Sequence, residues 1–170
     1  MVGHDFASLS TGFKYHAFII YSSKDHDFVK NILIPALERY SFKYCIHWKD
    51  FPVGEVFTST IVKSVYNSFK IIAVVSKNFA TGKVTKFELD QAQHRLLTKG
   101  DDCLFVIKYD DVDVTKVLGA PLLQRSYIDY TMDCDRRWLE SKLVQVLRNG
   151  VLEDESDDCS EGNADNNNLI

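Results

Sequence analysis

YHAFIIYSSKD, residues 15–25, joins the pattern of a buried strand to the start of a helix. Residues 15–21 are apolar throughout except for His16, which is typical of a strand covered on both faces in a parallel sheet. Hydroxyl and carboxylate side chains follow at 22–25 and can cap a helix N-terminus. Apolar residues then recur at helical spacing on both sides of Pro35, whose missing N–H should kink that helix. A strand followed directly by a helix is the first half of a βαβ unit.

The same alternation continues along the chain. Further strands are predicted at 42–47, 71–75, 103–109 and 126–129. Further helices are predicted at 57–68, 84–98 and 134–148, with one helical turn near Val117 and loops at 48–56 and 76–83. This spacing indicates an α/β fold of the flavodoxin-like type: a five-stranded parallel sheet in the order 2-1-3-4-5, with helices on both faces.

Composition is that of one soluble globular domain. The chain has 170 residues, is 45% apolar and 26% charged, and its 11 Phe, 8 Tyr and 2 Trp can fill a sizeable core. The sequence contains neither an apolar stretch long enough to span a membrane nor the start of a signal peptide. Its four cysteines are not spaced as zinc ligands, so we expect buried free thiols in a reducing compartment.

Charge is divided unevenly along the chain. Residues 151–170 contain seven acidic and no basic residues, whereas the rest of the chain is nearly balanced. No run of Lys or Arg predicts a nucleic-acid-binding surface. We therefore expect an N-terminal segment at 1–13, a compact domain at 14–149 and a disordered acidic tail at 150–170.

The sequence lacks the motifs of three kinds of site that this fold can carry: a phosphate-binding turn, a phosphoryl-accepting aspartate and a hydrolase nucleophile. The turn at 22–25 has no glycine that would let the backbone approach a phosphate. The third strand ends in Ser76-Lys77-Asn78, with no carboxylate to accept a phosphoryl group, and no serine or cysteine lies in a nucleophile-elbow motif. We expect His16 to be packed in its strand and His94 to be solvated on its helix. The sequence thus predicts no cofactor and no metal, and it favours an interaction module over an enzyme.

Three short motifs resemble the boxes of the Toll/interleukin-receptor (TIR) domain family, and the likeness extends over about residues 14–149. Box 1 is the strand and turn at 15–25. Box 2 is CIHWKDFPVGE at 45–55, in which a basic residue and an aspartate precede proline and glycine. Box 3 is an aromatic pair that opens the last helix, and half of it is present as Arg137-Trp138.

Two branches of that family share features with this chain. SKNF at 76–79 and KFELD at 86–90 are similar to the Toll-like receptor pattern, whereas Val53-Gly54-Glu55 is nearer the interleukin-receptor pattern. We favour the Toll-like receptor branch.

The resemblance implies an intracellular signalling domain of innate immunity. Such a domain would be the cytoplasmic part of a single-pass receptor, itself soluble and joined to the membrane only through a segment outside this chain. Its partners would be the TIR domains of adaptors and of a second receptor chain, in homo- or heterodimers. A soluble TIR adaptor is an alternative.

Box 2 is the predicted partner-binding site. Its apolar side chains lie in a connection between a strand and a helix, which offers little core in which to bury them. Folding back onto the sheet edge is an open alternative for each of its two aromatics, and Asp50 can bind loop amides or cap a helix instead of contacting a partner. The residues predicted to bind partners are Trp48, Lys49, Asp50, Phe51, Pro52, Val53, Gly54 and Glu55.

Glu88 is the alternative catalytic residue. Some TIR domains cleave NAD with a glutamate on the helix after the third strand, and Glu88 matches that position. The tryptophan that such enzymes carry a few residues earlier is replaced here by Val84 and Thr85. A single glutamate on a helix is more often a solvated side chain, so we expect no catalytic residue.

Overall fold

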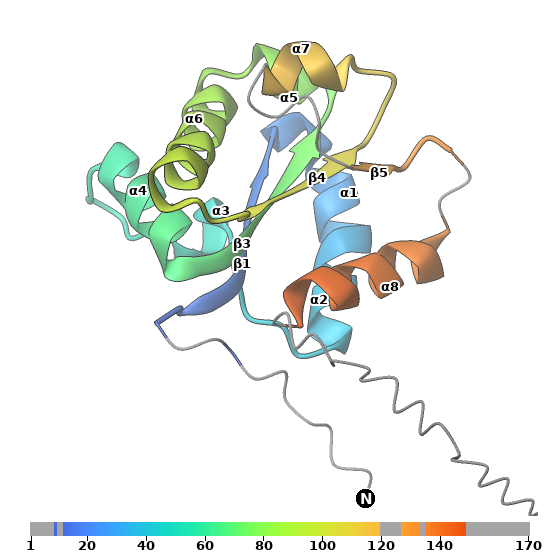
Figure 1. The fold of residues 1–170 in the computed structure, drawn as a ribbon, viewed down its shortest axis with the longest axis horizontal. Coiled ribbons are helices and arrows are strands. Elements are labelled where there is room, and N and C mark those ends of the chain that lie inside the picture. The colour runs from blue at the N-terminus through green and yellow to red at the C-terminus, as the bar shows by residue number, and fades with distance from the viewer. Residues whose placement is uncertain (1–8, 10–11, 120–126, 133–134, 149–170) are drawn as a thin grey trace, which may run out of the picture.

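The computed structural model describes residues 9, 12–119, 127–132 and 135–148. They form a five-stranded sheet in which every pair of neighbours is parallel, in the predicted order β2-β1-β3-β4-β5 (Figure 1). The strands are β1 (Tyr15–Tyr21), β2 (Tyr44–Cys45), β3 (Ser68–Val75), β4 (Leu104–Lys108) and β5 (Ile128–Asp129).

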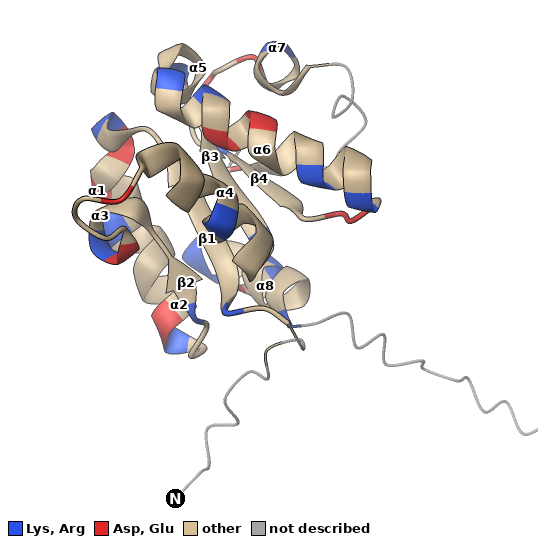
Figure 2. Ribbon diagram, turned by 90° about the vertical axis from the view of Figure 1, so that its left-hand side faces the viewer, with Lys and Arg blue, Asp and Glu red and all other residues tan. Residues whose placement is uncertain are grey.

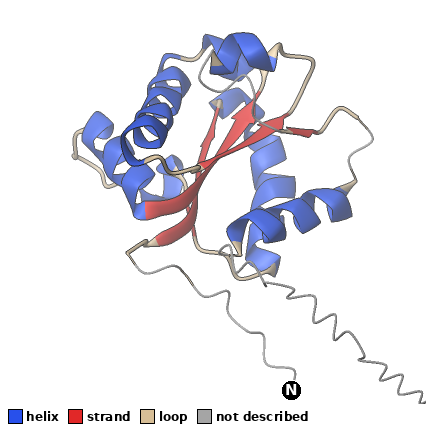
Figure 3. Cartoon of the chain, in the orientation of Figure 1, coloured by secondary structure: helices blue, strands red, loops and turns tan. Residues whose placement is uncertain are grey.

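Helices cover both faces of this sheet (Figure 3). One layer holds α4 (Phe57–Asn67), α5 (Lys77–Thr81), α6 (Lys83–Lys99) and α7 (Val114–Leu118). The other holds α1 (His26–Phe28), α2 (Ile34–Arg39) and α8 (Arg136–Leu147). Within the described ranges, no helix is both long and apolar enough to cross a membrane.

The two faces of the sheet have separate cores. Along β1, Ala17, Ile19 and Tyr21 pack towards α1, α2 and α8, whereas Phe18 and Ile20 pack towards α4 and α6. Successive side chains of a strand point to opposite faces, so a strand covered on both sides must be apolar at every position. This burial explains the unbroken apolar pattern at 15–21.

The helix predicted around Pro35 is divided into segments of different types. After a 3₁₀ turn at Ser23–Asp25 and α1, residues Val29–Leu33 form a π-helical turn, in which the Ile34 N–H bonds the carbonyl five residues earlier. Pro35 has no N–H to offer the carbonyl of Asn31. That carbonyl accepts a hydrogen bond of 3.4 Å from Arg136 at the start of α8. The proline therefore leaves an acceptor for the neighbouring helix.

Both long loops predicted around the sheet contain helical turns. The predicted loop at 76–83 holds α5, because the Ser76 hydroxyl accepts the Phe79 N–H at 3.0 Å and caps that helix. The predicted loop at 48–56 begins as α3 (His47–Asp50), which also shortens β2 to two residues.

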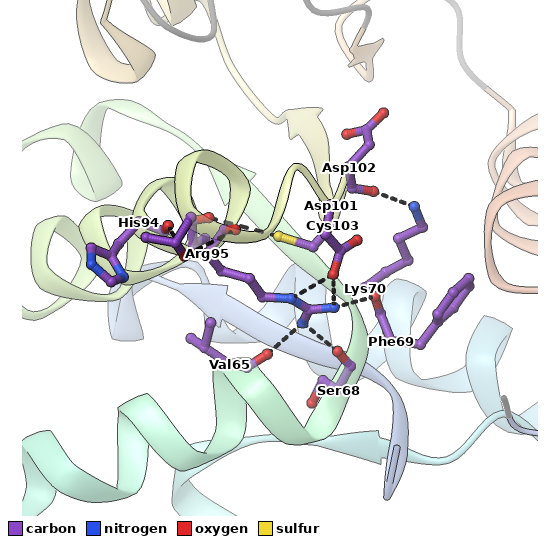
Figure 4. A network of polar contacts seen from close by, with 11 residues as sticks. Val65, Ser68, Phe69, Lys70, His94, Arg95, Asp101, Asp102 and Cys103 are labelled. Carbon is purple, nitrogen blue, oxygen red and sulfur yellow. Dashed lines mark hydrogen bonds and ion pairs between the residues drawn. The ribbon is translucent and has the colours of Figure 1, made fainter. Parts of the chain in front are cut away.

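A buried arginine on α6 ties three elements together (Figure 4). Arg95 is 1% exposed, and its guanidinium donates to the carbonyls of Val65 and Ser68, both at 2.5 Å, and of Phe69 at 3.3 Å. It also donates twice to the Asp101 carboxylate, at 2.9 and 2.6 Å. These carbonyls lie where α4 ends and β3 begins, and the last carbonyls of a helix lack partners within it. Arg95 supplies those partners from a neighbouring helix.

The chain enters the domain beside this arginine. The Phe13 ring packs edge-on against Phe69 with centroids 5.7 Å apart, and the Arg95 guanidinium lies 5.3 Å from the Phe13 centroid. The Lys14 N–H donates to the Asn67 carbonyl at 2.8 Å. Contacts with the domain therefore begin at least one residue before position 14.

Candidate functional site

Asp50 holds the base of box 2 together. Its Oδ2 accepts the Ile46 N–H at 2.8 Å, and the Asp50 N–H returns to the Ile46 carbonyl at 2.9 Å. These two hydrogen bonds close the turn of α3. Because the Ile46 N–H is bonded to Asp50, it does not pair with a neighbouring strand, and β2 ends at Cys45. Lys49, on the same turn, is exposed and lies over the Tyr44 ring. Asp50 therefore satisfies a loop amide, the structural alternative raised from the sequence.

The two aromatics of box 2 point in different directions. Phe51 is half-buried, with its ring centroid 5.4 Å from that of Phe57 and 6.1 Å from that of Phe18. Trp48 is 53% exposed and contacts the edge of His26, with centroids 5.8 Å apart. Phe51 thus anchors the loop on the sheet, whereas Trp48 stays on the surface.

The tip of box 2 projects into solvent. Pro52, Val53, Gly54 and Glu55 are all exposed, and Val53 is as accessible as an isolated residue, at 105%. Gly54 has a φ of +90°, a conformation in which any side chain would be strained. The loop thus combines a fixed base with an apolar tip that is free of packing contacts.

An apolar groove lies between α4 and α6, immediately after this tip in the chain. Phe57 and Ile61 from α4 and Val84 and Phe87 from α6 line it, and it encloses about 250 Å³. Phe57 and Val84 remain 42% and 47% exposed. Figure 2 shows that α4 is mostly uncharged on the side that faces the viewer, since Lys63 is its one charged residue. Sequence reasoning missed this groove, although the low charge of 57–67 was a visible signal.

A second cavity, of about 300 Å³, lies beyond the carboxyl end of β1. Tyr21, His47, Phe57 and Glu88 are among its lining residues. Glu88 is 1% exposed, and its Oε1 has no hydrogen-bond partner in the described part of the chain. Burial raises the pKa of this carboxyl to about 8. The expectation of a solvated Glu88 is therefore wrong.

The helical register of α6 explains why Glu88 is buried. Thr85, Ala92 and Arg95 are buried on the same face of the helix as Glu88, at spacings of three, four and seven residues. This spacing was readable in the sequence, but three of the four side chains are polar and do not mark an apolar face.

Box 2 contributes His47 to the lining of the Glu88 cavity, and Phe57 of α4 lines both this cavity and the apolar groove. His47 lies 5.7 Å from the Tyr21 ring, whose hydroxyl is 3.1 Å from Nδ1 of His26. Burial, followed by the nearby His26, lowers the pKa of His47. Since the pKa of Glu88 is raised, His47 and Glu88 are both mainly uncharged at neutral pH.

An internal polar network links the carboxyl ends of β1 and β3. Asp25, 6% exposed, accepts hydrogen bonds from the Ser76 hydroxyl and, at 2.9 Å, from the Asn78 side-chain amide. Parallel α/β sheets bind ligands at this end of their strands. Here both oxygens of the carboxylate are used to link the box 1 turn to α5. No cluster of three His, Cys, Asp or Glu suited to a metal occurs among the described residues.

The predicted environments of His16 and His94, and the burial of two of the four cysteines, are confirmed. His16 is buried, with its Nδ1 accepting a backbone N–H at 2.9 Å, and His94 is exposed on α6. Cys45 and Cys103 are buried free thiols. Burial raises the pKa of the Cys45 thiol to about 11. The other two cysteines and the acidic tail lie outside the described residues.

Comparison with known proteins identifies the family. Residues 14–124 match the family model of the TIR domain. Toll-like receptor 6 of Bos taurus is 33% identical over 132 residues, which cover 74% of this chain and 17% of that receptor. Toll-like receptor 2 of Bison bison is 35% identical over 127 residues, covering 70% of this chain and 16% of that receptor. The chain thus spans a small part of the length of these relatives.

Solved structures agree with the observed architecture. The TIR domain of the Toll-related receptor TRR-2 from Hydra magnipapillata superposes with a TM-score of 0.69 at 24% identity, covering 80% of this chain and all of that one. A metazoan TIR-STING receptor from C. gigas gives a TM-score of 0.60 at 25% identity, covering 82% of this chain and 42% of that one. The family match, the receptor relatives and the order of the five strands lead to one conclusion: this chain belongs to the Toll/interleukin-receptor (TIR) domain family.

Proposed function

We propose that this chain is a signalling interaction domain that recruits other TIR domains through box 2. The observation that carries the proposal is the construction of the loop, in which Asp50 and Phe51 fix the base and leave Pro52 and Val53 exposed at the tip. A loop that is already fixed loses less conformational entropy when it docks, so more of its contact energy contributes to binding.

The relatives support a setting in innate immune signalling. Similarity to Toll-like receptors favours a receptor domain on the cytoplasmic side of a membrane, held there by a segment outside this chain. In this setting, receptor dimerisation brings two TIR domains together, and their joint surface recruits the TIR domains of adaptors. The partners are a second receptor chain and the adaptors, and the mechanism is association without catalysis.

The recruitment role can be tested at the tip. We expect Pro52→His and Val53→Ser to weaken capture of an adaptor TIR domain about tenfold, because each removes apolar surface that the proposed contact would bury. Both residues are exposed, so thermal unfolding followed by circular dichroism should stay close to that of the parent.

Phe51→Ala is the matched contrast for these two variants. Phe51 packs on Phe18 and Phe57, so its truncation should lower the free energy of unfolding by about 2 kcal/mol. If Pro52→His and Val53→Ser also melted far below the parent, the tip would be part of the core and the site assignment would be wrong.

A second candidate function is cleavage of NAD at Glu88. The observation in its favour is a buried carboxyl with an unpaired Oε1 beside a cavity of about 300 Å³. Against it, the raised pKa keeps this carboxyl mainly protonated at neutral pH, whereas stabilising a cationic glycosyl transition state needs a carboxylate. The missing tryptophan near Val84 also argues against it. We therefore favour the interaction function.

The enzymatic candidate can be tested by measuring the release of nicotinamide from NAD. We expect the purified chain to release no more nicotinamide from NAD than a Glu88→Gln variant does. Asp90→Asn, which removes an exposed carboxyl from the same helix, is the control. Turnover that survives in Asp90→Asn and disappears in Glu88→Gln would show that the chain is an enzyme.

A further inference from the structure

The outward side of α8 carries basic side chains and no acidic one. Residues on this side recur at spacings of three and four along the helix and are half-buried or exposed: Arg137, Trp138, Ser141, Lys142, Gln145 and, just after the helix, Arg148. The one acidic residue of α8, Glu140, is 5% exposed on the side that packs on the domain, where it pairs with Arg39 of α2 at 2.5 Å. We call the basic side the α8 face.

The cations of the α8 face lack a counter-charge. Among the residues that the structure describes, no ion pair is recorded for Arg137, Lys142 or Arg148. The Lys142 ammonium lies 5.8 Å from the ring centroid of Trp138, which is 44% exposed. Asp135, before the helix, accepts the Trp138 N–H at 2.7 Å and caps the N-terminus. Three positive charges beside an exposed indole favour an acidic segment as the occupant of this surface.

An acidic segment follows α8 directly in the chain. Residues 153–158, which we call the acidic run, contain Glu153, Asp154, Glu155, Asp157 and Asp158. The four residues between Arg148 and this run begin with Asn149-Gly150, a dipeptide typical of tight turns that reverse the direction of the chain. The sequence therefore favours a return of the chain towards the helix that it has just left.

The acidic run matches the α8 face in length. A helix rises 1.5 Å per residue, so Arg137 and Arg148 are about 16 Å apart along its axis. An extended run over 153–158 spans about 17 Å at roughly 3.3 Å per residue. Carboxylates that run antiparallel to α8 can therefore reach Lys142 and Arg137 in turn. The last of them then lie near the amino end of the helix, where the helix dipole favours anions.

We propose that the acidic run docks on the α8 face of the same chain, with its carboxylates paired to Arg137 and Lys142. Single exposed ion pairs are weak, but a short tether holds the two partners at an effective concentration in the millimolar range. A segment that cannot order itself can become ordered by such a contact. The run then covers the α8 face, and another acidic partner has to displace it. This surface is separate from box 2, so the inference does not depend on the function proposed above.

Backbone ¹⁵N relaxation of the 170-residue chain measures docking as order in the acidic run. At about 0.01 M salt, the order parameters of 153–158 should exceed about 0.6, the limit of flexible backbone, whereas those of 163–168 should stay below it. At about 1 M salt, where charges are screened beyond about 3 Å, the two segments should become equally mobile.

Charge reversal on α8 tests the location of the contact. At low salt, Arg137→Glu/Lys142→Glu should lower the order parameters of the acidic run to those of 163–168, because attraction is replaced by repulsion. The matched control is Lys83→Glu/Lys86→Glu on α6, which changes the net charge equally at two exposed lysines. It should leave the order of the run unchanged. Circular dichroism melts of both variants separate loss of docking from loss of the fold.

Reversal of the acidic run provides a second variant, which changes nothing in the described part of the domain. On the parent α8, a run reversed to lysine should be mobile, and on Arg137→Glu/Lys142→Glu it should be ordered again. The reversed run carries Glu153→Lys, Asp154→Lys, Glu155→Lys, Asp157→Lys and Asp158→Lys.

Order in the parent run, its loss on reversal of α8 and its return when both charges are reversed support the proposal. A parent run as mobile as 163–168 at low salt overturns it. So does an equal loss of order in the α6 control, which would show that net charge alone matters, and so does order that survives the reversal of α8.

An anionic lipid surface is the competing occupant of the α8 face. Its test is sedimentation of the parent with phosphatidylserine vesicles at low salt. If the parent binds these vesicles through Arg137 and Lys142 while the acidic run stays mobile, the α8 face docks on lipid and the inference fails.

Discussion

Replacing Arg95 with lysine is expected to lower the free energy of unfolding by about 3–5 kcal/mol. The guanidinium, on a side chain that is 1% exposed, donates to three backbone carbonyls and to the Asp101 carboxylate. A lysine has three donors on one nitrogen and lacks the planar fork that reaches all four groups. Buried acceptors left without a donor each cost about 1–3 kcal/mol, and breaking the ion pair with Asp101 adds to this.

Urea unfolding of the variant and parent at one pH measures this effect. Arg137→Lys is the matched control, because Arg137 is exposed on α8 and has no recorded ion pair among the described residues. We expect it to fall within about 0.5 kcal/mol of the parent. An Arg95→Lys variant as stable as the parent would show that the carbonyls at the end of α4 find other partners.

Glu88→Gln is expected to make the stability of the protein less dependent on pH. The carboxyl has a pKa of about 8 in the folded protein against 4.5 for the ordinary group, so the folded state holds a proton that the unfolded chain releases above pH 4.5. The parent therefore loses stability as pH rises from 4.5 to 8, and no further above 8. The full shift corresponds to roughly 5 kcal/mol, and the glutamine, uncharged at every pH, does not incur this loss.

The measurement is the difference in unfolding free energy between variant and parent from about pH 5 to about pH 9. The difference should move steadily in favour of Glu88→Gln over most of this range and then level off. Asp90→Asn removes an exposed carboxyl from the same helix and should not reproduce the slope. A difference that is the same at every pH would mean that Glu88 is ionised in the folded protein at neutral pH.

The central strands of the sheet could be predicted from the sequence because their signal is local, and their order followed from the alternation of strands with helices. The residue ranges 15–21, 71–75 and 103–109 are mainly apolar, which is the pattern of central strands in a sheet covered on both faces. Family boxes then placed the first strand and box 2 on the elements where the structure shows them.

The missed features are those in which a polar side chain acts at a distance or inside a short turn. α3 forms because Asp50 reaches back four residues to an amide, and α5 forms because Ser76 caps it. Arg95 and Glu88 are polar residues buried on a helix face that faces the sheet, and nothing in their types distinguishes them from solvated neighbours such as Lys86. Phe51, and not Trp48, turns inward because Phe18 and Phe57 form a surface on which its ring packs. The sequence does not show that these rings lie close together.

The contact between Phe13 and Arg95 connects the point at which the chain enters the domain to α6. Near one end of this 17-residue helix, Arg95 contacts the ring at which the chain enters the domain; at the other end, Lys83 and Val84 form the edge of the apolar groove. A helix of this length is about 25 Å long and stiff. A displacement of the chain at Phe13 is therefore transmitted along a stiff helix to the apolar groove between α4 and α6.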